Sequence, residues 1–170
     1  MRKLRPPRCI KDVARPPSAQ ARAAILREYG SNCDVYGVGP ATEKEPYRIW
    51  VTLHADEDEP CPPVVVGATP TQPVFTFDDR RDGYDAEMVR SSEDEDDDDV
   101  GALVAFECSA CDGKRFHCTA GFQQIDDPLE GMDPVQAPPV PVEDLFGWFV
   151  LVAECVGCGG VVMVIDAECA

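Results

Sequence analysis

The order of apolar and polar positions in the first half of the chain predicts one helix and one strand. Residues 18–30 begin with a serine that can cap a helix and end with a glycine that can terminate it, and Ile25, Leu26 and Tyr29 share one face. Residues 47–54 alternate apolar and polar side chains with the two-residue period of a strand. Residues 64–66 and 74–77 are shorter extended pieces bounded by prolines.

From residue 100 onward, apolar segments predict short strands on either side of a loop. Residues 103–106 predict a strand that leads into Cys108, and residues 115–122 predict a second strand with one apolar face. Residues 126–142 are rich in proline and predict a loop. Residues 142–152 fit a helix at their start and a strand at their end, whereas residues 161–165 fit either element.

The apolar stretch 145–165 is long enough to cross a bilayer, and Glu154 is its single charged residue. A carboxylate near the bilayer centre costs about 2.5–3.5 kcal/mol, no Lys or Arg flanks the stretch, and three nearby glycines favour a loop. We therefore expect no membrane association.

Proline content and charge divide the chain into two expected regions. Most of the 16 prolines precede residue 91, and residues 93–99 are consecutive carboxylates that repel one another. We expect residues 1–99 to be mostly disordered or irregular, with one short helix and one strand, and residues 100–170 to form a separate domain. The formal charge of −17, with a basic segment at the N-terminus, argues against DNA or RNA binding.

The cysteines indicate a metal site. Met1 is not followed by the apolar run of a secretory signal, and an odd count of nine cysteines disfavours a disulfide framework and suggests a reducing compartment. Two Cys-x-x-Cys pairs supply the four thiolates of a structural zinc site. The predicted ligands are Cys108, Cys111, Cys155 and Cys158.

Catalytic patterns are lacking, and we expect a binding protein that is not an enzyme and has no small-molecule substrate. The sequence has two histidines, no recognisable Ser-His-Asp arrangement and no glycine-rich phosphate loop after a strand. Four cysteine ligands also leave a zinc ion without an open position for substrate.

Together these motifs resemble those of the papillomavirus E-seven oncoprotein family. The shared features are two serines before an acidic run, a Cys-x-x-Cys-Asp motif, a strand that ends in cysteine, an acidic segment before leucine and a second Cys-x-x-Cys. They correspond here to Ser91 and Ser92, residues 108–112, residues 114–118, residues 143–146 and residues 155–158.

The resemblance implies a small α+β zinc module of the β-β-α-β type that forms a homodimer through residues 100–170. In it, residues 142–147 would be a helix and residues 149–154 the third strand. It also implies phosphorylation of Ser91 and Ser92 and binding to retinoblastoma-type proteins through a Leu-x-Cys-x-Glu motif. The nearest match to that motif is Leu53, Ala55 and Glu57, with alanine in place of cysteine.

Three functional hypotheses follow. The first is a zinc-binding viral regulatory protein of the host nucleus and cytoplasm that binds host cell-cycle regulators and promotes S-phase entry. The second is an acidic, cytoplasmic bacterial immunity protein that is folded throughout and neutralises a basic toxin by charge complementarity. The third is a cellular zinc ribbon in transcription, although such ribbons are usually basic and only Lys114 and Arg115 are available in this domain.

Overall fold

The computed structural model describes residues 5–40, 45–54, 58–89, 101–137 and 139–169. These residues form nine strands, two α-helices and one 3-10 turn. In chain order the elements are β1 (Ala14–Arg15), α1 (Ala19–Tyr29), β2 (Cys33–Val38), β3 (Arg48–Leu53), β4 (Pro60–Thr69), β5 (Gln72–Phe77), α2 (Tyr84–Val89), β6 (Val104–Ala105), β7 (Phe116–Gln124), η1 (Val142–Asp144), β8 (Phe146–Cys155) and β9 (Val161–Glu168).

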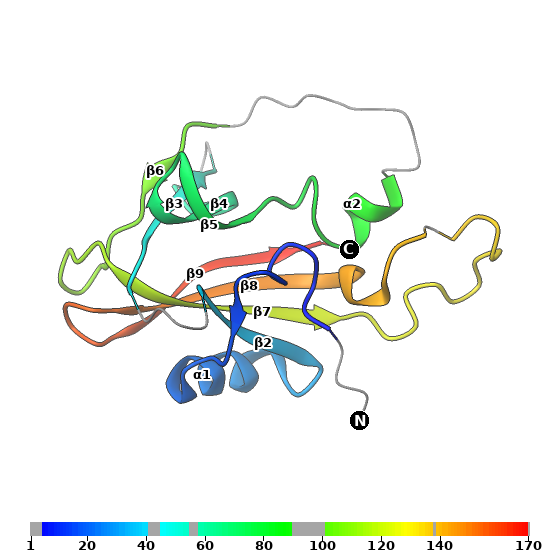
Figure 1. Ribbon diagram of the computed structural model, residues 1–170, viewed down its shortest axis with the longest axis horizontal. Coiled ribbons are helices and arrows are strands. Elements are labelled where there is room, and N and C mark those ends of the chain that lie inside the picture. Colours follow the sequence, from blue (N-terminus) through cyan, green and yellow to red (C-terminus); the bar gives the residue numbers. More distant parts are fainter. Residues whose placement is uncertain (1–4, 41–44, 55–57, 90–100, 138, 170) are drawn as a thin grey trace.

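The strands make two antiparallel sheets. The five-stranded sheet has the order β1-β2-β7-β8-β9, and the four-stranded sheet has the order β5-β4-β3-β6. Each sheet contains strands from both sides of residue 99, because β2 pairs with β7 and β3 pairs with β6. Figure 1 shows the four-stranded sheet on one side of the five-stranded sheet and α1 on the other.

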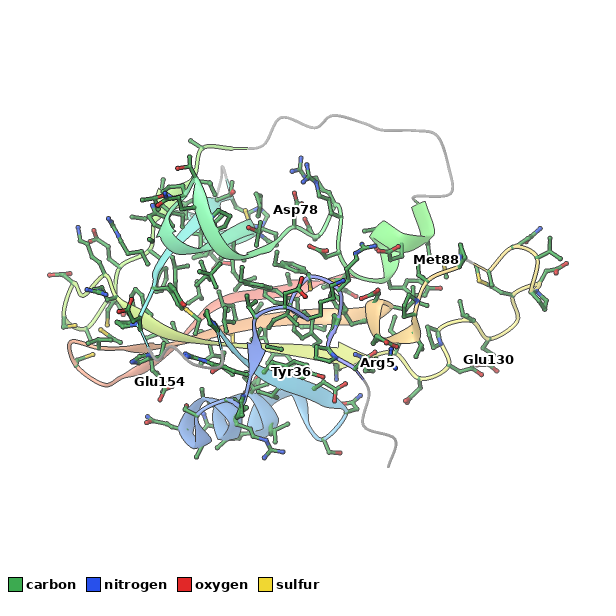
Figure 2. The ribbon with its side chains drawn as sticks, viewed as in Figure 1. Arg5, Tyr36, Asp78, Met88, Glu130 and Glu154 are labelled. Atoms are coloured by element: carbon green, nitrogen blue, oxygen red, sulfur yellow. The ribbon has the colours of Figure 1, made fainter. Side chains whose placement is uncertain are left out.

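The main hydrophobic core lies between the two sheets, whose side chains fill the space between them (Figure 2). Its centre is aromatic: Phe77 of β5 stacks on Phe149 of β8 with ring centroids 3.7 Å apart. Phe75 and Phe122 lie 6.1 Å and 5.4 Å from Phe149, and all four rings are buried. Residues far apart in sequence therefore share one core.

A second, smaller core lies between α1 and the opposite face of the five-stranded sheet. Ser18 caps the helix by accepting a hydrogen bond from the backbone N–H of Ala21, and Gly30 ends it with a φ of 76°. Ile25 is fully buried against this sheet. A Cβ atom on Gly121 of β7 would lie 2.9 Å from Ile25, so the close approach of helix and sheet requires glycine here.

The prediction of a mostly disordered or irregular N-terminal half was wrong. The helix predicted over residues 18–30 and the strand predicted over residues 47–54 are confirmed as α1 and β3. The two extended pieces lie within β4 and β5, and β1, β2 and α2 were not predicted. These elements are ordered because they pack against residues of the C-terminal half, which local patterns do not reveal.

The many prolines misled the prediction because of where they lie in the sheet. At the start of β4, Pro60 and Cys61 pair with β3, Pro62 and Pro63 lie in a register shift, and the pairing of β4 with β5 begins at Val64. A proline lacks the N–H donor of a sheet ladder, and this loss is tolerated where a strand has a neighbour on one side alone. Proline is therefore compatible with the start of β4.

The predicted β-β-α-β arrangement of residues 100–170 was also wrong. The helix expected over residues 142–147 is one 3-10 turn, Val142–Asp144, and β8 begins after the intervening Leu145 at Phe146. Residues 149, 151 and 153 of β8 face the four-stranded sheet, whereas Val150 and Val152 face α1. A strand covered on both faces has an almost continuous apolar sequence, which resembles that of a buried helix.

The apolar stretch 145–165 forms the hairpin of β8 and β9. Within the described ranges, no helix has the length and apolar character needed to span a bilayer. The apolar side chains of this hairpin are largely covered within the chain by the four-stranded sheet and α1. The homodimer stays a prediction.

Candidate metal centre

Antiparallel pairing of β7 and β8 brings the two Cys-x-x-Cys motifs to one end of the five-stranded sheet. The first knuckle, residues 108–113, precedes β7, and the second knuckle, residues 155–160, joins β8 to β9. Phe116 at the start of β7 pairs with Cys155 at the end of β8, so this register places the motifs side by side. The backbone N–H of Val156 also donates to Arg115 O at 3.0 Å.

The two knuckles share one backbone conformation. The N–H of Cys108 donates to Gly113 O at 2.9 Å, and the N–H of Cys155 donates to Gly160 O at the same distance. In each knuckle the residue four places after the first cysteine donates back to that cysteine's carbonyl at 2.8 Å. These residues have positive φ angles, 56° at Asp112 and 72° at Gly159.

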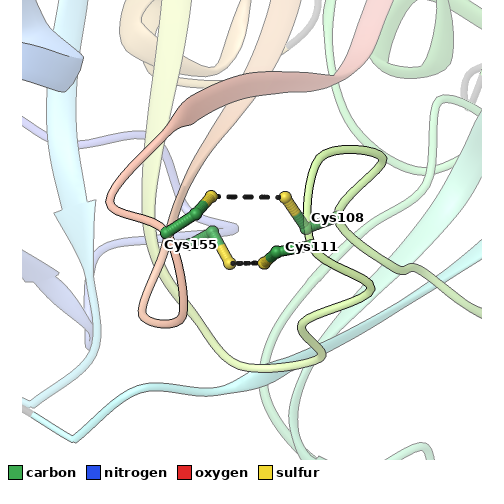
Figure 3. A group of neighbouring side chains, drawn as sticks. Cys108, Cys111 and Cys155 are labelled. Atoms are coloured by element: carbon green, nitrogen blue, oxygen red, sulfur yellow. Dashed lines mark hydrogen bonds between the residues drawn. The ribbon is translucent and has the colours of Figure 1, made fainter.

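The four sulfur atoms of Cys108, Cys111, Cys155 and Cys158 all lie within 4.8 Å of one another. Cys108 Sγ lies 3.7 Å from Cys158 Sγ, and Cys111 Sγ lies 3.5 Å from Cys155 Sγ; dashed lines mark both contacts in Figure 3. Four sulfurs around a tetrahedral zinc ion, each about 2.3 Å from the metal, are about 3.8 Å apart. The cluster therefore has the dimensions of a tetrahedral metal site.

The centre is buried on one side and open on the other. Cys108 and Cys155 are 1% and 2% exposed, whereas Cys111 and Cys158 are exposed. Each knuckle thus contributes one sulfur next to the core and one at the surface.

Hydrogen bonds within the cluster shift the pKa values of Cys155 and Cys111 in opposite directions. The backbone N–H of Cys158 stabilises the Cys155 thiolate and, with help from Cys111 and the Gly157 N–H, lowers the pKa of Cys155 to about 7 despite desolvation. The Gly113 N–H acts in the same direction on Cys111, but hydrogen bonds with the other thiols and desolvation raise the pKa of Cys111 to about 12. A metal ion bound at this site would therefore have to displace the proton of Cys111.

Glycine leaves room for the sulfur atoms. A Cβ atom on Gly113 would lie 2.8 Å from Cys155 Sγ and 3.1 Å from Cys111 Sγ, both closer than ordinary contact. Outside the cluster, Lys114 Nζ lies 2.7 Å from Glu107 Oε1 and closes the base of the first knuckle. This ion pair is half exposed and contributes at most about 1 kcal/mol.

Comparison of the chain with protein-family models, with curated proteins and with solved structures finds no match. The chemistry of the site is therefore argued from its own geometry.

Of the other predicted site residues, the structure describes Leu53 alone. Leu53 ends β3 and is 37% exposed. Ala55, Glu57, Ser91 and Ser92 lie outside the described residues. The predicted roles of these residues in partner binding and phosphorylation stay predictions.

Sequence reasoning identified the four cysteines but missed the hydrogen bond that closes each turn. Both motifs continue to a glycine five places after the first cysteine, Gly113 and Gly160, which accepts the hydrogen bond that closes the knuckle. This repeated Cys-x-x-Cys-x-Gly spacing was visible in the sequence. It would have indicated two matching metal-binding turns without any structure.

Proposed function

We propose that Cys108, Cys111, Cys155 and Cys158 bind one Zn²⁺ ion in a structural role. The observation that carries this proposal is the cluster of four thiols within 4.8 Å of one another on two matching turns. Four thiolates in a tetrahedron suit zinc, and iron is the main competitor for such a site. A set of four protein ligands leaves no open position for substrate, which favours stabilisation over catalysis.

The ion would join the connection from β6 to β7 with the β8–β9 hairpin and so add to the strand pairing that holds them. The first knuckle lies in the connection from β6 of the four-stranded sheet to β7 of the five-stranded sheet. Only two residue pairs connect β6 to β3, so this end of the four-stranded sheet is weakly held. A metal bound to both knuckles would fix the connection to the β8–β9 hairpin.

Metal analysis of the full-length protein tests the proposal. After purification under reducing conditions, elemental analysis of zinc and iron is expected to find about one zinc per chain. Cys155→Ser is expected to lose the metal and much of its thermal stability, because three thiolates bind zinc more weakly and the knuckle loosens.

Cys61→Ser is the matched control, since Cys61 is a partly exposed cysteine on β4 outside the cluster. It is expected to keep the metal. Wild-type protein that binds no metal, or that retains it fully in Cys155→Ser, would contradict the proposed site. Iron in place of zinc would keep the site and change its metal.

We further infer that the protein acts by binding a basic protein partner, as in the second hypothesis from the sequence. That hypothesis expects a chain folded throughout, and an ordered N-terminal half supports it over a disordered arm. No Lys or Arg follows residue 115, and Asp126, Asp127, Glu130 and Asp133 are exposed on the loop after β7. Such a surface attracts positive charge and repels nucleic acid.

Salt elution tests the class of partner. Proteins captured at low ionic strength on the immobilised full chain are expected to be basic and to elute by about 1 M NaCl, where the Debye length is about 3 Å. Capture of neutral or acidic proteins that stay bound at that salt concentration would contradict the inference. The viral function rests on the sequence motifs alone, and binding of a retinoblastoma-type protein that is lost in Leu53→Ala would support it.

A further inference from the structure

The four sulfur atoms of the centre are not equivalent towards solvent. Cys111 and Cys158 are exposed, whereas their neighbours Cys155 and Cys108 are buried. A dissolved oxidant therefore reaches one sulfur of each knuckle first. The oxidised sulfur then reacts with a nearby thiol if one lies within reach.

The hydrogen bonds between thiols show which partner is nearest. Cys111 Sγ lies 3.5 Å from Cys155 Sγ and Cys108 Sγ lies 3.7 Å from Cys158 Sγ, and both of these hydrogen bonds connect different knuckles. Each of these pairs contains one exposed and one buried sulfur. Each pair thus combines a sulfur accessible to an oxidant with a protected thiol that can resolve the oxidised form.

We propose that hydrogen peroxide converts the centre into two disulfides, Cys111–Cys155 and Cys108–Cys158, and expels the metal. In each pair the exposed sulfur, which would be a thiolate as a ligand of the metal, attacks a peroxide oxygen and becomes a sulfenic acid, with hydroxide as the leaving group. The buried sulfur then attacks the sulfenic sulfur, which forms the disulfide and releases a second hydroxide. The centre consumes two peroxide molecules and four protons and yields two disulfides, four water molecules and one Zn²⁺ ion.

This pairing has a consequence that pairing inside each Cys-x-x-Cys motif lacks. Both disulfides connect the first knuckle, in the segment from β6 to β7, to the second knuckle on the β8–β9 hairpin. The oxidised chain therefore keeps the connection that the metal is proposed to make. The inference rests on the proposed metal site, and it adds that oxidation replaces one cross-link by another while the fold is kept.

Tryptic mapping without reduction tests the pairing directly in the full-length protein. Lys114 and Arg115 are the only Lys or Arg residues from 91 to 170, so cleavage separates residues 91–114, with the first pair of cysteines, from residues 116–170, with the second pair and Cys118 and Cys169. Metal content is measured first, and the protein is then treated with about two equivalents of peroxide per chain. We expect metal release, together with a cross-linked species of the two peptides that disappears on reduction.

Paired variants assign the individual bonds. Cys111→Ser with Cys155→Ser retains the pair Cys108 and Cys158, and it is expected to keep one peroxide-dependent cross-link. The double variant Cys111→Ser with Cys158→Ser retains only the two buried sulfurs of the cluster. It is expected to form at least about tenfold less of the peroxide-dependent cross-link. Circular dichroism of each variant confirms that the chain remains folded, and the wild-type map does not depend on any variant.

The outcomes separate this inference from the metal proposal. Separate peptides that each carry an internal disulfide, or cysteines oxidised only to sulfinic or sulfonic acid, would overturn the inference even if zinc is bound. A cross-link of the expected pairs in a chain that never held metal would contradict the metal site and leave the pairing in place.

Discussion

Substitution of Phe77 by alanine tests whether the two halves of the chain share one core. Phe77 belongs to β5, is fully buried and stacks on Phe149 at 3.7 Å with an interplanar angle of 16°. Removal of a buried phenylalanine side chain costs about 3–5 kcal/mol, of which the aromatic pair accounts for about 0.5–1.5 kcal/mol. Phe77→Leu fills more of the space and is expected to cost about 1–1.5 kcal/mol.

The two tryptophans make the measurement specific to each sheet. Trp50 lies on β3 of the four-stranded sheet and Trp148 on β8 of the five-stranded sheet. Urea unfolding is followed by tryptophan fluorescence in two backgrounds. Trp148→Phe leaves Trp50, which reports on the four-stranded sheet, and Trp50→Phe leaves Trp148, which reports on the five-stranded sheet. We expect Phe77→Ala to shift both transitions to the same lower midpoint with an unchanged slope.

Val135→Ala is the control, because Val135 is 91% exposed and its truncation is expected to change stability by less than about 0.5 kcal/mol. The reasoning would be refuted if Phe77→Ala left the Trp148 transition in place or cost less than about 1 kcal/mol. Either result would mean that β5 does not contribute to the core of the five-stranded sheet.

Three further substitutions test local features. Gly113→Ala is expected to lower zinc affinity in chelator competition at least about tenfold, because the new Cβ would lie 2.8 Å from a ligand sulfur. Arg8→Ala is expected to lower the free energy of unfolding in urea by about 1–3 kcal/mol, because Arg8 pairs at 2.6 Å with Glu87, which is 2% exposed. Burial opposes ionisation of Asp78, but Arg80 outweighs burial and lowers the pKa of this carboxyl. The pair therefore stabilises the fold above pH 3.8, and this contribution is lost as the pH falls through the lowered pKa. Thermal melts between pH 5 and pH 2 are expected to show a smaller loss in this acid range for Arg80→Gln than for the wild type.

Each of these three expectations has an outcome that contradicts it. Unchanged affinity in Gly113→Ala would mean that the first knuckle is not close to the metal. Lys11→Ala is the control for Arg8→Ala because Lys11 is exposed. Equal losses of stability in the two variants would mean that the ion pair of Arg8 with Glu87 does not stabilise the fold. Parallel pH curves for Arg80→Gln and the wild type would show that Arg80 does not set the acid sensitivity of Asp78.

Local patterns in the sequence determined several individual elements. The capping serine and terminal glycine located α1, and the two-residue alternation located β3. The spacing of the cysteines identified all four residues of the candidate metal centre. These features succeed because a cap, a strand period and a Cys-x-x-Cys turn depend on residues only a few positions apart.

Only the tertiary structure decided how these elements combine. No local pattern shows that Phe77 packs on Phe149, or that β2 pairs with β7 across the acidic run. The prolines of β4 suggested disorder until the pairing showed that residues 60–63 precede the pairing with β5 and include a register shift opposite β3. The apolar run of β8 became a strand because α1 and the second sheet cover its two faces, and burial of this kind is set by partners distant in sequence.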